Sequence, residues 1–383
     1  MKYPIYMDYN ATTPLDKEVL EAMLPYLTDH FGNAASRFHA YGWKAAEAVD
    51  LARQQVAGLL GASEKEIVFT SGATESVNLA IKGVYEAFSR KGNHIITVAT
   101  EHKAVLDTCQ HLEKSGAEIT YLPVDSEGNI DLTLLEASIR PTTILISVMA
   151  ANNEIGVTYP LKTITEIAHR HQVLFHTDAT QAVGKLLIDV IADEIDLLSM
   201  SAHKLYGPKG VGALYIRKKL NIVAQQDGGK HERGLRSGTL NVPGIVGLGK
   251  ACEICQQRMT REAIRLGALR DSLENGILGA IPETKINGNI TYRLPNTSNI
   301  CFGRIDGEQL LMSLNEIAVS NGSACNSAST EPSYVLKALG LDDDSAYGSI
   351  RFSLGRMTKP EDIDFAIKHI IEVVNRMQKV RVF

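Results

Sequence analysis

The sequence of 383 residues is 44% hydrophobic and 22% charged, which is typical of a folded globular protein with a sizeable core. Its 39 basic and 44 acidic residues give a net charge of −5, and this argues against nucleic acid as a partner. The start, MKYPIYMDYN, has no apolar signal region, and no run is long enough to cross a bilayer. We therefore expect a cytoplasmic protein with no membrane partner.

The five cysteines are few and odd in number, which predicts reduced thiols rather than a disulfide framework. Cys252 and Cys255 have CxxC spacing, but they lie in a helical pattern with no second pair nearby. Because a zinc site needs about four ligands, the spacing favours two thiols on a helix face over a metal site.

From about residue 70 to residue 215, apolar β-type runs alternate with helical segments. This alternation predicts an α/β protein with a mostly parallel sheet flanked by helices. The expected strands are 67–69, 94–100, 143–149, 173–176, 197–200 and 210–216. Ligands of such sheets bind beyond the carboxyl ends of the strands, so the residues that follow the strands are candidates for one pocket.

Asp178 and Lys204 follow two successive predicted strands. Such an acid and lysine can form a structural ion pair. Alternatively, the lysine can form a Schiff base with pyridoxal 5′-phosphate (PLP) while the acid holds the pyridinium nitrogen. These two residues alone leave both interpretations open.

Three other strand ends carry polar groups. The turn Ser71-Gly72-Ala73-Thr74 opens a helix and can bind a phosphate through backbone N–H groups, or it can be an ordinary capped turn. His102 follows strand 94–100 and belongs either to the same pocket or to a helix cap. Asn153 can contact polar ring substituents or cap the next turn.

The pattern changes near residue 258, where a long amphipathic helix (264–277) leads into short strands. We expect a large domain over 15–257 and a small α+β domain over 258–383, joined in space by the N-terminal arm 1–14. Arg351 lies in an apolar strand and needs an anion, either a substrate carboxylate or an internal ion pair.

The segment SNGSACNSASTE surrounds Cys325 with small and polar residues. Structural cysteines are usually buried among apolar residues. We therefore expect a loop with an exposed, reactive thiol at Cys325.

Taken together, the motifs resemble the cysteine desulfurases of the NifS/IscS-like type, within the class V aminotransferase fold (PLP fold type I). The resemblance runs from about residue 4 to residue 360. In chain order, the motifs are DYNATTP, FTSGATESVNLAI, TEHKAV, NNEIG, HTDATQAVGK, SAHKLYGPKG, ERGLRSGT, SNGSACNSASTEPSYVL and SIRFSLGR.

The resemblance implies a role for each candidate residue. Lys204 is similar to the lysine that holds PLP, Asp178 to the acid on the pyridine nitrogen, and His102 to the imidazole that stacks on the ring. The groups near the phenolic oxygen and substrate are Gln181 and Asn153, and Arg351 resembles the substrate carboxylate anchor. The implied phosphate site comprises Ala73, Thr74, Ser201 and His203, with Thr239 reaching the phosphate of a second subunit.

The implied activity is sulfur removal from L-cysteine, which gives L-alanine and a persulfide on Cys325. The implied partners are a second copy of the chain and a sulfur acceptor or iron–sulfur scaffold protein, with Cys325 a candidate ligand of a cluster shared with that scaffold. The sequence ends at Phe383, where many iron–sulfur members continue into a scaffold-docking tail, so docking stays open. The alternatives are a selenocysteine lyase, another class V PLP enzyme, or a non-catalytic sulfur or metal carrier.

Overall fold

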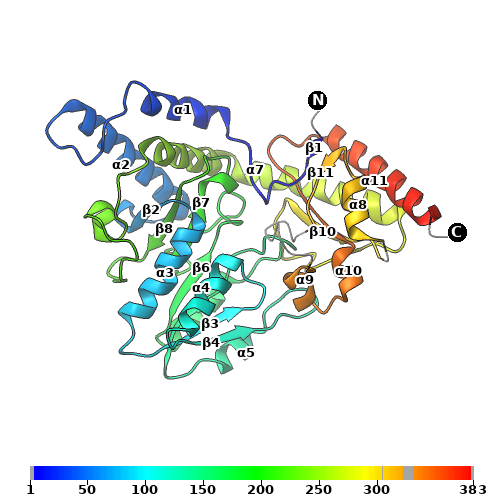
Figure 1. The fold of residues 1–383 in the computed structure, drawn as a ribbon, viewed down its shortest axis with the longest axis horizontal. Coiled ribbons are helices and arrows are strands. Elements are labelled where there is room, and N and C mark those ends of the chain that lie inside the picture. Colours follow the sequence, from blue (N-terminus) through cyan, green and yellow to red (C-terminus); the bar gives the residue numbers. More distant parts are fainter. Residues whose placement is uncertain (1–3, 304, 322–330, 381–383) are drawn as a thin grey trace.

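The computed structural model describes residues 4–303, 305–321 and 331–380 of the chain. Over these residues the largest element is a seven-stranded sheet in the order β2-β8-β7-β6-β5-β3-β4 (Figure 1). Its strands are β2 (Ile67–Thr70), β3 (His94–Val98), β4 (Glu118–Leu122), β5 (Thr143–Ser147), β6 (Leu174–Asp178), β7 (Leu197–Ser201) and β8 (Gly212–Ile216). Within this sheet β8 runs antiparallel to both neighbours, and the other pairs are parallel.

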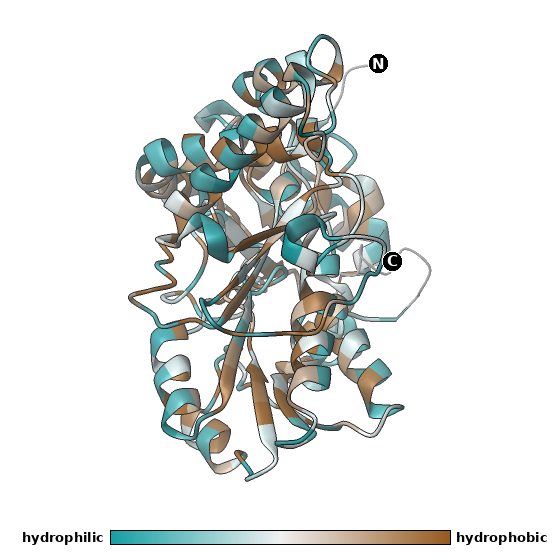
Figure 2. Cartoon of the chain, turned by 90° about the vertical axis from the view of Figure 1, so that its left-hand side faces the viewer, coloured by the Kyte–Doolittle hydropathy of each residue, from teal (hydrophilic) through white to brown (hydrophobic). Residues whose placement is uncertain are grey.

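Helices cover both faces of this sheet, and its central strands are therefore buried on both sides. Ile95 packs in one core and the next residue, Ile96, in the other, as the two-residue period of a strand requires. The helices of this part are α1 (Lys17–Leu27), α2 (Ala40–Leu60), α3 (Ala73–Ala87), α4 (Lys103–Glu113), α5 (Leu132–Ala137) and α6 (Leu161–Arg170). In Figure 2 the strands are mostly brown and the outer turns of the helices carry the teal, hydrophilic residues. The predicted α/β architecture is confirmed.

A second, smaller core lies around short strands. An antiparallel sheet of order β12-β10-β9 and a parallel pair β1-β11 are found among the described residues. The elements of this part of the chain are β1 (Ile5–Tyr6), β9 (Lys285–Ile286), β10 (Thr297–Cys301), α8 (Gly307–Ser313), β11 (Ile317–Ala318), α9 (Tyr334–Ala338), α10 (Asp343–Tyr347), β12 (Ser349–Ser353) and α11 (Pro360–Val380). Of these, α9 and α10 place their buried side chains in the large core. The N-terminal arm belongs here, since Ile5 pairs with Ile317 and Met7 packs in this core.

One helix, α7 (Val242–Ala280), joins the two cores (Figure 1). Its first half contributes Ile245, Leu248 and Cys252 to the large core, and its second half contributes Leu269 and Leu273 to the small one. The change of pattern near residue 258 is therefore a change of core within one helix of 39 residues, and not a new helix at 264. We propose that the boundary between the domains 15–257 and 258–383 lies inside α7.

The sequence did not predict β4. This strand forms the edge of the large sheet, and its residues Glu118 to Tyr121 are exposed or only partly buried. A strand buried on one side only has no continuous apolar run, and Glu118 masks the pattern further. The omission does not affect the predicted pocket, because β4 lies at the end of the sheet.

Candidate active site

The candidate residues meet at a cavity of about 380 Å³, a size that suits a cofactor and a small substrate. It opens at the carboxyl ends of the strands, where β3, β6 and β7 each lead into one of its walls. Of the residues predicted from sequence, the lining includes Ala73, Thr74, His102, Asn153, Asp178, Gln181, Ser201, His203, Lys204 and Arg351. These residues come from several separate elements of the chain and share one cavity.

Two predicted residues are not placed there. Thr239 is exposed and does not line the cavity of its own chain. Cys325 lies outside the described residues. Cys252 and Cys255 are buried free thiols of α7, and burial raises the pKa of Cys255 to about 11. Among the described residues there is no cluster of three or more His, Cys, Asp or Glu side chains that suits a metal ion.

Lys204 and Asp178 do not form an ion pair with each other among the contacts of the described residues. Asp178 ends β6, is 5% exposed, and its Oδ1 accepts a hydrogen bond from the Thr180 amide at 3.0 Å. Lys204 follows β7 in the short 3-10 helix Ala202–Lys204, and its Nζ donates to the carbonyls of Asn10 at 2.5 Å and Ala11 at 2.7 Å. The contacts of Lys204 within the described part of the chain therefore include main-chain oxygens of the N-terminal arm.

A cationic end of the cavity surrounds the N-terminus of α3. The helix begins at Ala73, directly after the N-cap Gly72, so its first N–H groups face the cavity lined by Ser71 to Thr74. Lys204 and Lys209 line the same cavity. Burial and the charges of these lysines lower the pKa of His203 to about 4, so its ring is neutral at neutral pH. This end suits an anion such as a phosphate.

Gly212 of β8 makes the close approach of this turn possible. A Cβ atom at Gly212 would lie 2.7 Å from the Cα of Gly72 and 2.5 Å from the Met200 carbonyl oxygen. Only glycine allows β8 to pack so tightly beneath the turn that opens α3. The shape of the anion-binding end therefore depends on a residue that does not line it.

His102 occupies the N-cap of α4, and its Nδ1 accepts a hydrogen bond from the Ala104 amide at 3.1 Å. The ring is therefore both a cap and part of the cavity wall, so the two alternatives that the sequence left open are compatible. Because Nδ1 accepts, the neutral ring carries its proton on Nε2.

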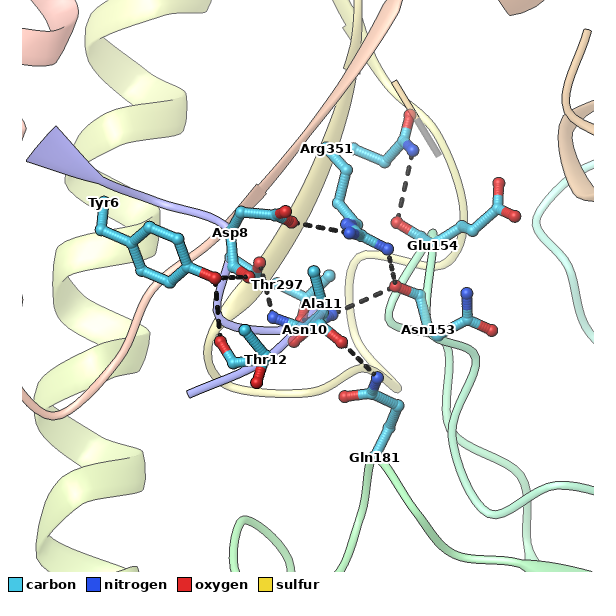
Figure 3. Close-up of polar contacts among 12 residues, drawn as sticks. Tyr6, Asp8, Asn10, Ala11, Thr12, Asn153, Glu154, Gln181, Thr297 and Arg351 are labelled. Atoms are coloured by element: carbon cyan, nitrogen blue, oxygen red, sulfur yellow. Dashed lines mark hydrogen bonds and ion pairs between the residues drawn. The ribbon is translucent and has the colours of Figure 1, made fainter. Parts of the chain in front are cut away.

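Arg351 lies in β12 with only 2% of its surface exposed. Its guanidinium pairs with Asp8 at 2.7 Å and donates to the Asn153 carbonyl at 3.0 Å (Figure 3). The internal ion pair that the sequence named as one alternative is thus present. Among the described residues, however, Arg351 Nε and Asn153 Oδ1 are buried polar atoms with no hydrogen-bond partner, and both residues line the cavity.

The N-terminal arm contributes more to the site than the sequence suggested. Asn10 is 1% exposed, its side chain donates to Asn153 and Thr297, and its carbonyl accepts from Gln181 at 2.9 Å (Figure 3). The Thr12 hydroxyl lies 3.1 Å from His203 Nδ1. The motif DYNATTP was a signal for this contribution, but pattern and spacing alone could not show that a main-chain oxygen carries it.

The residues present fit PLP. The acid Asp178 suits the pyridinium nitrogen, Lys204 suits the Schiff-base lysine, and the cationic N-terminus of α3 suits the phosphate. Thr180 Oγ1 is a further buried hydroxyl without a partner among the described residues, and it lines the same cavity. Unpartnered buried polar atoms are costly, so their gathering at this cavity indicates a polar ligand.

Comparisons with known proteins agree with this geometry. The family model "Aminotransferase class-V" matches residues 5–365. "Cysteine desulfurase IscS" of Anaeromyxobacter dehalogenans is 54% identical over 99% of this chain and 95% of its own length. The solved structure "NIFS-LIKE PROTEIN" is 40% identical with a TM-score of 0.92, covering 97% of this chain and 100% of that one. The structure "SspA in complex with cysteine" is 40% identical with a TM-score of 0.81 over 91% of this chain and 98% of that one.

The family assignment rests on the length of these matches as well as on their identity. The matched residues include both cores, the N-terminal arm and α7. The chain therefore belongs to the class V aminotransferase family and, within it, to the cysteine desulfurases, which are PLP enzymes.

Proposed function

We propose that this protein removes sulfur from L-cysteine with PLP, producing L-alanine and a persulfide on Cys325. The observation that carries the proposal is the placement of Lys204, Asp178 and Arg351 on one cavity of about 380 Å³. The acid and lysine suit the cofactor, and the buried guanidinium suits the carboxylate of an amino acid. One of the related structures is described as a complex with cysteine.

One set of cavity residues suits the cofactor and another set suits the substrate. Lys204 would hold the cofactor, Asp178 its ring nitrogen and His102 its ring face, while Ala73, Thr74, Ser201 and His203 would hold the phosphate. Arg351 and Asn153 hold the substrate carboxylate. Bound PLP supplies an electron sink for the bonds at Cα.

The chain's own groups then move one proton and one sulfur atom. The Lys204 amine takes the Cα proton of cysteine. The Cys325 thiolate attacks the substrate sulfur, the Cβ–S bond breaks, and Cβ keeps the bonding electrons and is protonated. The Lys204 ammonium returns a proton to Cα, which gives alanine. The sulfur stays on Cys325 as a persulfide. Neutral His203 adds no charge to the phosphate end, so Lys204, Lys209 and the α3 N-terminus carry its positive potential.

We further propose that the protein is a homodimer. Thr239 is exposed in this chain and so is free to reach a phosphate held by a second copy. The α1–α2 segment exposes large apolar side chains, namely Leu24, Leu27, Phe31, Phe38 and Trp43. Exposed apolar surface of this extent marks an interaction site.

The acceptor of the sulfur is, in this proposal, a protein thiol or an iron–sulfur scaffold, with Cys325 as a candidate ligand of a shared cluster. No helix of the described residues is long and apolar enough to cross a membrane. We propose the cytoplasm as the site of action, because a catalytic thiol must be kept reduced between turnovers and reducing compartments do this.

The direct test is alanine formation from L-cysteine by the PLP-loaded protein. Lys204→Ala is expected to lower the rate about a thousandfold, because the general base is lost. Lys114→Ala, at an exposed position at the end of α4, is the matched control and should keep the rate. Comparison with selenocysteine as substrate tests the lyase alternative. Alanine formation that survives Lys204→Ala would contradict the proposal.

A further inference from the structure

Gln181 lies at the centre of a hydrogen-bonded chain whose far end is a second lysine. Gln181 is 5% exposed and lines the cavity. Its Nε2 donates to the Asn10 carbonyl at 2.9 Å (Figure 3). On the other side, the Nζ of Lys185 donates to Gln181 Oε1 at 3.1 Å and to the Gln181 carbonyl at 2.9 Å.

These contacts fix the direction of the Gln181 amide. An amide has one end that only accepts and one that only donates. When the Lys185 amine is protonated, its contact with Oε1 makes the flipped arrangement unfavourable, because the flip would place two donors against each other. Burial and the charge of Lys204 lower the pKa of Lys185 to about 7, so this orientation is held most firmly at and below neutral pH. The donor end of Gln181 is thereby kept on the side of Asn10 and the cavity.

The surroundings of Lys185 show that holding Gln181 is its main polar contact. Among the described residues, no carboxylate lies within ion-pair distance of its amine, and Lys185 lines a small second cavity together with Lys204 and Tyr206. Gly184 has φ +78°, and a Cβ there would lie 2.9 Å from Cys255 Sγ. This glycine lets the chain place Lys185 close against α7.

We propose that Lys185 is a positioning residue for the cofactor that acts through Gln181, keeping the Gln181 amide nitrogen available as a hydrogen-bond donor to the phenolic oxygen of PLP. The inference rests on the proposed function only in taking PLP as the cofactor and Gln181 as the neighbour of that oxygen. It adds a residue that lies behind the cavity wall and does not touch the ring.

The proposal has a spectroscopic consequence. A hydrogen-bond donor disperses the negative charge of the phenolic oxygen. The oxygen then holds less tightly the proton that it shares with the Lys204 nitrogen. Loss of the donor should raise the pH midpoint at which the absorption of bound PLP changes. A hydrogen bond of ordinary strength corresponds to a shift of about one pH unit.

The test is a pH titration of the PLP absorption spectrum of the loaded protein. Lys185→Met keeps the length of the side chain and removes the donor, so its midpoint should rise by about one pH unit. Lys185→Arg retains a cationic donor and should stay near the wild-type value. Lys250→Met, at a lysine of α7 that pairs with Glu253, is the matched control and should leave the midpoint unchanged.

A double-mutant cycle with Gln181→Ala separates this role from a direct effect of charge. If Lys185 acts through Gln181, Lys185→Met shifts the midpoint in the wild-type background and not in the Gln181→Ala background. An equal shift in both backgrounds, or no shift in either, would overturn the proposal. A wild-type protein that lacks the PLP spectrum would instead refute the proposed function.

Discussion

The pair formed by Arg351 and Asp8 keeps a charge inside the small core. Arg351 is 2% exposed and its pairing with Asp8 spans 2.7 Å between the N-terminal arm and β12. Removing one partner of such a pair leaves the other charge buried and unpaired. We expect Asp8→Asn to lower the free energy of unfolding by about 3 kcal/mol.

Urea unfolding of the two proteins measures this difference. Asp50→Asn, at an exposed aspartate of α2, is the control and should change stability by less than about 0.5 kcal/mol. Asp8→Asn should also raise the KM for cysteine more than it lowers kcat, because Arg351 loses the group that orients it. Equal stability of Asp8→Asn and wild type would show that Arg351 is balanced by other groups.

Glu154 gives the stability a distinct dependence on pH. The residue is buried, its Oε2 accepts a hydrogen bond from the Ser333 hydroxyl at 2.5 Å, and burial raises its pKa to about 7. Because the folded-state pKa lies above the unfolded value, the folded state binds the extra proton. This contribution is fully present below about pH 4.5 and is lost as the pH rises through about 7.

The matching variant is Glu154→Gln, which is neutral at every pH. Between pH 5 and pH 8 the stability of the wild type should fall by about 1 to 3 kcal/mol relative to Glu154→Gln. Urea unfolding of both proteins at pH 5 and at pH 8 measures this change in the free energy of unfolding. A difference between the two proteins that stays constant from pH 5 to pH 8 would mean that Glu154 is ionised throughout.

The cysteines differ in their expected reactivity. Cys109, Cys252, Cys255 and Cys301 are buried, and burial raises the pKa of Cys109 to about 12. A buried thiol of raised pKa reacts slowly. We expect a thiol reagent to modify about one cysteine of the native protein, and none rapidly in Cys325→Ser, whereas unfolding exposes all five. Rapid reaction of Cys325→Ser would place the reactive thiol elsewhere.

At the level of single residues, the sequence predicted side chains better than main-chain groups. Lys204, Asp178 and His102 follow buried strands, so topology alone brings them to one edge of the sheet. The carbonyls of Asn10 and Ala11, which accept from Lys204, have no signature in residue type. The position of Lys185 behind Gln181 depends on the bend at Gly184, which spacing does not reveal.

Among the elements, α7 determines how the two cores are held together. A helix of 39 residues is about 58 Å long. Near its middle, Glu262 pairs with Arg356 at 2.7 Å, and Arg356 also pairs with Asp16 at 2.5 Å. This cluster ties α7 to the start of α1 and to the segment after β12, next to the cavity that Lys204 and Lys185 share.

Breaking α7 between the cores should therefore weaken both the fold and the site. Thr260→Pro, at an exposed position of the helix, should cost about 3 kcal/mol or more. Thr260→Ala is the control and should be neutral or slightly stabilising. Thermal unfolding measures the stability of the two variants, and PLP retention measures whether their site is intact. If Thr260→Pro kept its stability and its PLP, the continuity of α7 would be unimportant for the site.

Some elements could be predicted from the hydrophobic pattern of the sequence and others could not. The buried strands of the large sheet were predicted because strands covered on both faces are continuously apolar. The continuity of α7 was not predicted, since its apolar face changes direction where the helix passes from one core to the other. A changed periodicity indicates either a break or a change of neighbour, and only the structure distinguishes them.

At the scale of the whole molecule, the proposed dimer explains both the exposure of Thr239 and the apolar side chains of the α1–α2 segment. Sedimentation should give a mass of twice 41.8 kDa. Replacing Phe38 and Trp43 together by Glu should shift the protein toward the monomer, because two charges would enter a buried surface. The same changes should lower PLP retention if Thr239 of the second copy contacts the phosphate. A monomeric wild type with full activity would contradict the dimer.

The central claim is that sulfur leaves cysteine by way of Cys325. Its most direct measurement is one turnover of the PLP-loaded protein with limiting L-cysteine and no reductant, followed by quantification of alanine and the mass of the Cys325 peptide. We predict equal amounts of alanine and of a Cys325 peptide that is heavier by one sulfur atom, and neither product in Cys325→Ser, which keeps its PLP spectrum. Alanine formed by Cys325→Ser at the wild-type rate would contradict the account.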